Sequence, residues 1–148
     1  MPTMPAPSVM TLEAANALVP RLRELMDAQT ARRRDIEERI DGLAKLLGKT
    51  PGALEVEAGD SPEVREVKTD IVARLESYQA AWAPLEEMGA VLKDPRTGLV
   101  DFYGHVDGRL VWLCWRYGED AITHYHQLNE GFSGRKRIED TLRQRHLN

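Results

Sequence analysis

The residues of this chain that could perform chemistry gather in its second half. Four of them have side chains that bind divalent metal ions: Asp101, Cys114, Glu119 and His126. Thiolate, imidazole and carboxylate groups are the ligands that such ions prefer, and His105 and His124 could substitute for a member of the set. The sequence contains no CxxC, HExxH or ExxH spacing. A metal site therefore competes with a purely structural interpretation, in which Cys114 is a small buried residue and His126 a capping or surface group.

Basic residues form a second candidate, a site for an anion. The side chains that could contribute are Lys93 and Arg135, with Arg109, Lys136 and Arg137 in support. Gly131 and Gly134 would let backbone amides approach a phosphate, and an arginine offers two parallel donors. Because the segment matches neither the P-loop nor the GxGxxG motif, the competing interpretation is a solvated basic tail balanced by the acidic residues that follow it.

Nucleophilic catalysis is a third candidate, with Cys114 as the nucleophile, His126 as the base and Asp101 orienting the base. Cys114 is expected in the middle of a strand among bulky residues, which is a poor place for a reactive thiolate. A different enzyme could use the polar face of a β-hairpin, with Glu119 or His126 as general acid or base. The sequence leaves open whether the chain is an enzyme.

The first half of the chain has helical periodicity. Apolar residues step by threes and fours over residues 18–47 and again over residues 64–85, which is typical of amphipathic helices. Thr11 and Ser61 are the expected N-caps. We therefore expect a long antiparallel two-helix hairpin over residues 11–89, packed stripe to stripe as in a coiled coil.

The second half begins with the pattern of a β-hairpin. Two β-rich runs flank Asp107-Gly108, a favoured two-residue turn, and this turn makes Asp101 the direct cross-strand neighbour of Cys114. Alternation predicts an apolar face turned toward the helices, made of Val100, Phe102, Val111, Leu113 and Trp115. The opposite face would carry Asp101, Tyr103, His105, Trp112 and Cys114.

The expected fold is mainly α with a small β part: a long antiparallel two-helix hairpin plus a C-terminal β-hairpin and a short helix. The short helix should run from Glu119 to about Gln127. We expect a flexible tail over residues 1–10 and a single domain over residues 11–148. Within that domain, the helical hairpin occupies 11–89, the β-hairpin and C-terminal segment 90–137, and a basic tail 138–148.

Composition narrows the classes of partner and location. The chain has 148 residues, 42% of them hydrophobic and 30% charged, which is ordinary for one globular domain. Its net charge of −4 argues against nucleic acid and anionic lipid as partners. A lone cysteine, no long apolar run and no signal-peptide pattern together indicate a cytoplasmic protein with no membrane segment.

Three stretches of the chain also form a recognisable pattern. They are TLEAANALVPRL from Thr11, GAVLKDP with TGLVDF from Gly89, and LCWRYGE from Leu113 with the later His126 and GFSGR. Together they resemble the bacterial family known as domain of unknown function 2203, over nearly the whole chain from Thr11 to Arg135.

The resemblance implies that several residues belong to a shared pattern: Asp101, Cys114, Trp115, Glu119, His126 and Arg135. The family has no established activity, so it implies either a polar functional site or a buried ion-pair network that fixes the fold. The family pattern varies at the position of His124, which leaves His124 out of the preferred ligand set. It usually has a proline near the position of Arg137, which weakens a role for the basic cluster.

The sequence therefore predicts a small cytoplasmic binding or assembly module with a polar site on its C-terminal β-hairpin. We expect it to form a homo-oligomer, because the long apolar stripes exceed what one hairpin can cover. The alternatives are a protein that binds a divalent metal ion, or an enzyme, using the same four residues: Asp101, Cys114, Glu119 and His126. The identity of a substrate or a protein partner lies beyond the sequence.

Overall fold

The computed structural model describes residues 8–147, with side chains up to residue 142. Residues 1–7 of the expected tail therefore lie outside the described residues. The described residues divide into two compact units: residues 8–26 together with 84–147, and residues 27–83. Of the described residues, 50% are helical and 19% lie in strands.

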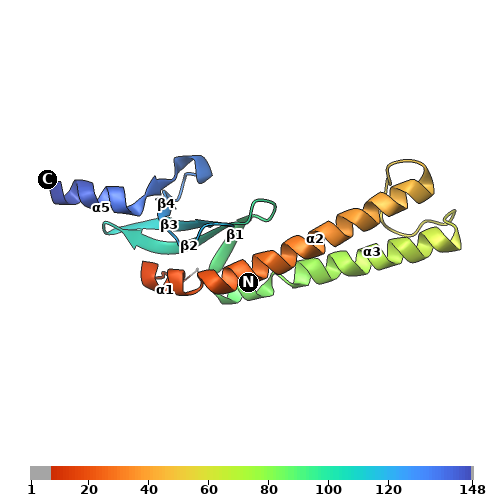
Figure 1. The fold of residues 1–148 in the computed structure, drawn as a ribbon, viewed down its shortest axis with the longest axis horizontal. Coiled ribbons are helices and arrows are strands. Elements are labelled where there is room, and N and C mark those ends of the chain that lie inside the picture. Colours follow the sequence, from red (N-terminus) through yellow and green to blue (C-terminus); the bar gives the residue numbers. More distant parts are fainter. Residues whose placement is uncertain (1–7, 148) are drawn as a thin grey trace, which may run out of the picture. The chain divides into compact units, whose positions relative to one another are not determined.

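The first unit is built on a five-stranded antiparallel sheet in the order β1-β2-β3-β4-β5. Figure 1 labels its first four strands. The strands are β1 (Ala90–Asp94), β2 (Leu99–Val106), β3 (Arg109–Arg116), β4 (His124–His126) and β5 (Lys136–Arg137). The helical elements of this unit are α1 (Leu12–Ala17), the start of α2 (Val19–Leu47), α4 (Ala83–Glu87), the short 3-10 helix η1 (Phe132–Gly134) and α5 (Ile138–Leu147).

The turn between β2 and β3 fixes the register of the sheet. Asp107 and Gly108 both have positive φ angles, 55° and 77°, as a two-residue hairpin turn of the type I′ class requires. Asp101 therefore pairs with Cys114, and Phe102 pairs with Leu113. This cross-strand register confirms the one predicted from the Asp-Gly turn.

Both faces of the sheet are buried at its centre. The predicted apolar face is confirmed, because its members are all fully buried: Val100, Phe102, Val111, Leu113 and Trp115. The opposite face is also closed, since Asp101 and Cys114 are 0% exposed and Trp112 is 7% exposed. His105, farther along β2, is exposed. The face that carries Asp101, Trp112 and Cys114 is therefore also largely part of the interior.

The second unit contains the rest of α2 and the helix α3 (Pro62–Ala80). Its core is formed by Leu43, Val64 and Ile71, and ion pairs between the two helices join Arg39 to Asp70 at 3.0 Å and Arg74 to Asp35 at 2.8 Å. No helix in the part of the chain that the structure describes combines the length and the apolar character needed to cross a bilayer.

The fold class predicted from the sequence is wrong in its helical half. A single long helix, α2 with 29 residues, stands where a hairpin of two long helices was expected over residues 11–89. The spacing of the apolar residues does not reveal where the helices are interrupted. α1 ends at Ala17, α3 ends at Ala80, and α4 is a separate helix of 5 residues. The N-caps were predicted correctly, because Thr11 accepts from the amide of Ala14 and Ser61 from that of Val64.

The fold class is also wrong in its β half. The β part is a five-stranded sheet, not an isolated hairpin, and the short helix expected from Glu119 to Gln127 does not form. The second part of that segment forms the strand β4, which pairs with β3. β3 is buried, so its backbone groups need hydrogen-bond partners on both edges, and the β-branched and aromatic residues of 122–126 suit a strand. The expected basic tail over 138–148 forms α5 over most of its length.

Lys68 is a buried cation in the second unit. Its side chain is 4% exposed, and Nζ donates to Asp60 Oδ2 at 2.8 Å and to the carbonyl oxygen of Glu55 at 3.1 Å. The backbone amide of Glu57, and then the ammonium group of Lys68, hold the pKa of Asp60 below its ordinary value. This ion pair fastens the segment before α3 to the helix itself.

We expect Asp60→Asn to lower the melting temperature more than Lys68→Met does. The first variant leaves a buried ammonium without a counter-ion, whereas the second removes the charge and keeps an apolar stem. Because the folded-state pKa of Asp60 is lowered, its contribution to stability is present above about pH 4 and is lost as the pH falls through that lowered pKa. Thermal unfolding measured from neutral to acid pH tests both statements, and equal melting temperatures for the two variants would contradict the first.

Candidate metal centre

Three of the predicted ligands meet on one face of the sheet. Asp101 lies on β2, Cys114 opposite it on β3, and His126 on β4, where it pairs with Trp112. A carboxylate oxygen, the Cys114 Sγ and an imidazole nitrogen of this cluster all lie within 4.8 Å of one another. Adjacent antiparallel strands turn paired residues to the same face, so the register alone places these side chains together.

The contact between Asp101 and His126 holds a proton inside the protein. His126 Nε2 lies 2.8 Å from Asp101 Oδ2, and His126 Nδ1 lies 3.0 Å from the carbonyl oxygen of Gln127. A carbonyl oxygen only accepts hydrogen bonds, so Nδ1 carries a proton. The contact of Nε2 with Oδ2 needs one more proton, shared by the imidazole and the carboxylate, and the pair as a whole is then electrically neutral.

The second oxygen of Asp101 lacks a good partner. Asp101 Oδ1 is buried and has no hydrogen-bond partner among the described residues. The thiol of Cys114 lies beside this carboxylate and interacts with it, but only as a weak donor. Burial raises the pKa of Asp101, and the positive charge of His126 opposes that rise. An unpaired acceptor in a buried site is costly, and it is a usual sign of a group that binds an ion or water.

The environment of Cys114 is unfavourable for a nucleophile. Burial first, and then the neighbouring carboxylate of Asp101, raise the pKa of its thiol far above its ordinary value. The thiol is therefore protonated at neutral pH, and a protonated thiol is a poor nucleophile. It becomes a thiolate where a metal cation takes the place of its proton.

Glu119, the fourth predicted ligand, lies outside the cluster of three. Its Oε1 accepts from the backbone amide of Arg116 at 2.7 Å, and its two carboxylate oxygens accept from Nη2 of Arg135 at 2.8 and 3.0 Å. Glu119 therefore orients Arg135. The two reserve histidines are not members of the cluster: His105 is exposed, and His124, which pairs with Cys114 across the strands, has its Nδ1 2.8 Å from Thr123 Oγ1.

The two residues predicted to bind an anion contact different aromatic rings. Lys93 Nζ lies 4.0 Å from the ring centroid of Trp112, whereas the guanidinium carbon of Arg135 lies 4.7 Å from that of Phe132. Arg135 lines a pocket with His124, and Lys93 is not part of its lining. Burial, followed by the positive charge of Arg135, holds the pKa of His124 below its ordinary value.

Side chains on the polar face of the β-hairpin pack against one another and are largely buried. The rings of Tyr103 and Trp112 stack with their centroids 4.0 Å apart, and Asp101 and His126 are both buried. An enzyme that used these groups would need an opening through which substrate reaches them. Sequence reasoning missed β4, although the composition of residues 122–126 carried the signal, and so it missed how His126 reaches Asp101.

The fold and the site define a mixed helix and sheet protein with a buried aspartate, cysteine and histidine at the centre of an antiparallel sheet. The chain belongs to a family described as uncharacterized conserved proteins (DUF2203), whose sequence profile matches residues 8–138. This match confirms the resemblance noted in the sequence. No curated protein and no solved structure shows significant similarity to the chain.

We expect Glu119→Ala to lower the free energy of unfolding by about 1–3 kcal/mol, because it removes hydrogen bonds to a guanidinium group that is largely buried. Urea unfolding at neutral pH measures the change. The matched control is Glu87→Ala, which removes an exposed carboxylate near the end of α4. Equal stability of the Glu119 variant and the control would show that the ion pair of Glu119 with Arg135 contributes nothing to the free energy of unfolding.

Proposed function

We propose that this protein binds a divalent transition metal ion of the zinc class through Asp101, Cys114 and His126. The observation that carries the proposal is the convergence of three different ligand types within 4.8 Å of one another in a buried site. A zinc ion holds its ligand atoms about 3.3–3.8 Å apart, given its usual bond lengths and tetrahedral geometry. Metal binding would therefore require the side chains to bring the most widely separated ligand atoms up to about 1 Å closer together.

The charge of the cluster supports the same proposal. Without metal, the Asp101–His126 pair shares one proton and Cys114 keeps its own, so the cluster is neutral. A divalent cation that displaces both protons leaves a carboxylate, a thiolate and a neutral imidazole, whose charges again cancel those of the ion. The exchange therefore places no net charge in the interior, which is the term that most often makes a buried ion unfavourable.

The hydrogen bond on the far side of His126 supports metal binding at Nε2. A metal-bound histidine usually donates its other ring N–H to a carboxylate or a backbone carbonyl, which fixes the tautomer and the ring orientation. Nδ1 of His126 already makes that contact with Gln127. Sulfur, nitrogen and oxygen ligands together favour zinc, cobalt or a similar ion over magnesium and calcium, which prefer oxygen alone.

Metal content tests the proposal directly. We expect stoichiometric zinc in protein loaded with zinc and dialysed, and a loss of affinity of about tenfold or more in Cys114→Ser, His126→Gln and Asp101→Asn. The matched controls are Glu119→Gln and His105→Gln, which alter an acid and a histidine outside the cluster and should keep the metal. Circular dichroism verifies that each variant is folded.

Cobalt loading adds a spectroscopic measurement. Cobalt bound to a thiolate absorbs as a sulfur-to-metal charge-transfer band, and that band should vanish in Cys114→Ser. A folded wild-type protein that retains neither zinc nor cobalt would overturn the proposal. Metal retained equally by all three ligand variants would do the same.

Zinc binding should release about two protons, one from the thiol of Cys114 and one from the Asp101–His126 pair. The apparent affinity should therefore rise with pH, by up to about a hundredfold per pH unit where both sites are protonated in the free protein. Calorimetry in buffers of different ionisation enthalpy counts the protons. A release close to zero would contradict the exchange of protons for metal.

Self-association and a cytoplasmic location are further proposals that the sequence suggests. The molar mass in solution at low micromolar concentration tests the first, and a monomer would contradict it. Neither is needed for the metal centre, whose three ligands all come from one chain.

A further inference from the structure

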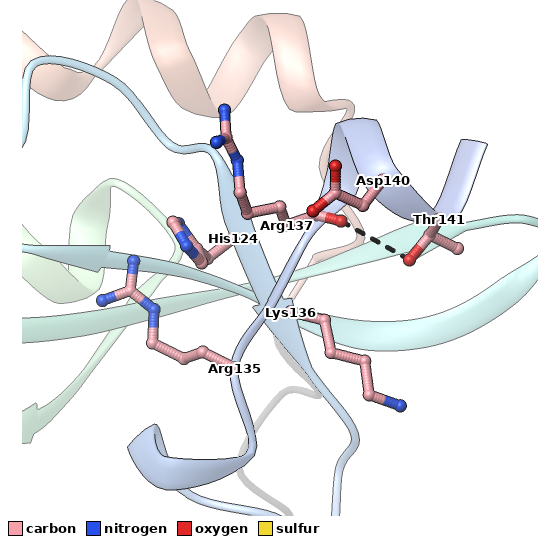
Figure 2. Close-up of a pocket in the computed structure, with 6 residues that line it drawn as sticks. All are labelled: His124, Arg135, Lys136, Arg137, Asp140 and Thr141. Carbon is pink, nitrogen blue, oxygen red and sulfur yellow. Dashed lines mark hydrogen bonds between the residues drawn. The ribbon is translucent and has the colours of Figure 1, made fainter. Parts of the chain in front are cut away.

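A pocket lies at the edge of the sheet, next to β4 and β5 and the start of α5 (Figure 2). Six residues line it: His124, Arg135, Lys136, Arg137, Asp140 and Thr141. Three of them are permanent cations and one is an acid. This excess of positive groups is a local feature, because the chain as a whole has a net charge of −4.

Arg135 is held in a fixed orientation in this pocket. Its side chain is 9% exposed, and both of its hydrogen bonds to Glu119 use the same nitrogen, Nη2. The aromatic ring of Phe132 lies against its guanidinium group. Nε is buried and has no hydrogen-bond partner among the described residues. An oriented guanidinium group with unused donor capacity is the usual feature of a site that recognises an oxyanion.

Arg137 supplies a second and more adaptable cation. Its side chain is 56% exposed, and its ion pair with Glu139 is long, at 3.5 Å. In Figure 2 the side chains of Arg135 and Arg137 extend from the same short segment as Lys136, which points away from both. Arg135 and Arg137 also both contribute positive charge at the ring of His124. The two arginines therefore face a common region.

We propose that this pocket binds a tetrahedral oxyanion of the phosphate class, either inorganic phosphate or the phosphate group of a monoester, through Arg135 and Arg137. The oriented arginine supplies a fixed positive charge, and the donors that Glu119 does not use are left for an oxyanion. The exposed arginine closes on the anion from the solvent side. Thr141 bounds the pocket on α5 and is itself held by the hydroxyl of Tyr125 at 2.8 Å.

The pocket and the metal centre are separate proposals, because none of the three proposed metal ligands lines the pocket. The variant Asp101→Asn, which removes a metal ligand, should therefore leave anion binding unchanged. If anion binding is lost in that variant while circular dichroism shows that the variant is folded, the anion binds to the metal ion and the pocket is not its site. Measuring anion binding by this variant therefore distinguishes failure of the anion-site proposal from failure of the metal-site proposal.

Titration calorimetry with inorganic phosphate and with phenyl phosphate, at constant ionic strength, tests the pocket. We expect saturable binding to wild-type protein and a loss of about tenfold or more in Arg137→Gln, because a hydrogen bond to a charged group contributes on that scale. Arg135→Lys keeps the charge but loses the planar fork, and it should weaken binding as well. The matched control is Arg109→Gln, an equal change of charge at an exposed position beside the hairpin turn.

The outcomes distinguish inorganic phosphate from a phosphate monoester as the ligand. They also distinguish binding in this pocket from a nonspecific effect of net charge. Tighter binding of phenyl phosphate would identify a monoester as the ligand, and equal or weaker binding would identify free phosphate. An equal loss in the Arg137 and Arg109 variants would show that only net charge matters, which overturns the site. Absence of saturable binding of both ligands at millimolar concentration would also overturn it.

Discussion

The buried contact between Asp101 and His126 determines how the sheet is built. A carboxylate that is fully removed from water requires a partner that supplies a proton or a positive charge. Its neighbour on β3 provides only a thiol, so the partner has to come from another strand, and His126 on β4 supplies it at 2.8 Å. The hairpin of β2 and β3 thereby gains β4, and the next short strand pairs with β4 in turn. Loss of either partner would leave the other buried and unpaired.

The part of the site that could be predicted from the sequence follows from local chemistry. Asp107 and Gly108 adopt positive φ angles, and a two-residue turn of that kind leaves one possible register for the strands on either side. Asp101 and Cys114 consequently become neighbours without any contribution from the rest of the fold. The helix starts at Thr11 and Ser61 were equally local, because a capping side chain bonds to an amide only three residues away.

The remainder depends on contacts between residues far apart in the chain. β4 has three residues, too few for alternation to distinguish a strand from a turn of helix, and it forms because β3 offers it an edge. The pair of Glu119 with Arg135 joins residues 16 apart in the chain, and no spacing rule relates them. Helical periodicity in the first half was real, but it cannot show where the backbone interrupts a helix, so a hairpin of two long helices was the wrong fold class.

One strand links the two proposed sites, and its alternation explains how they coexist. His124 and His126 are two residues apart on β4 and so face the same side of the sheet, the first toward the pocket and the second toward the buried cluster. A metal ion bound at the cluster would lie near the basic groups of the pocket. It would repel them less if protons left the cluster as the ion bound. The proposed neutral exchange at Asp101, Cys114 and His126 would provide that compensation, because the total charge of the cluster would be the same with and without the ion. The positive potential of the proposed anion site would then come from the pocket's own arginines, with or without a metal ion at the cluster.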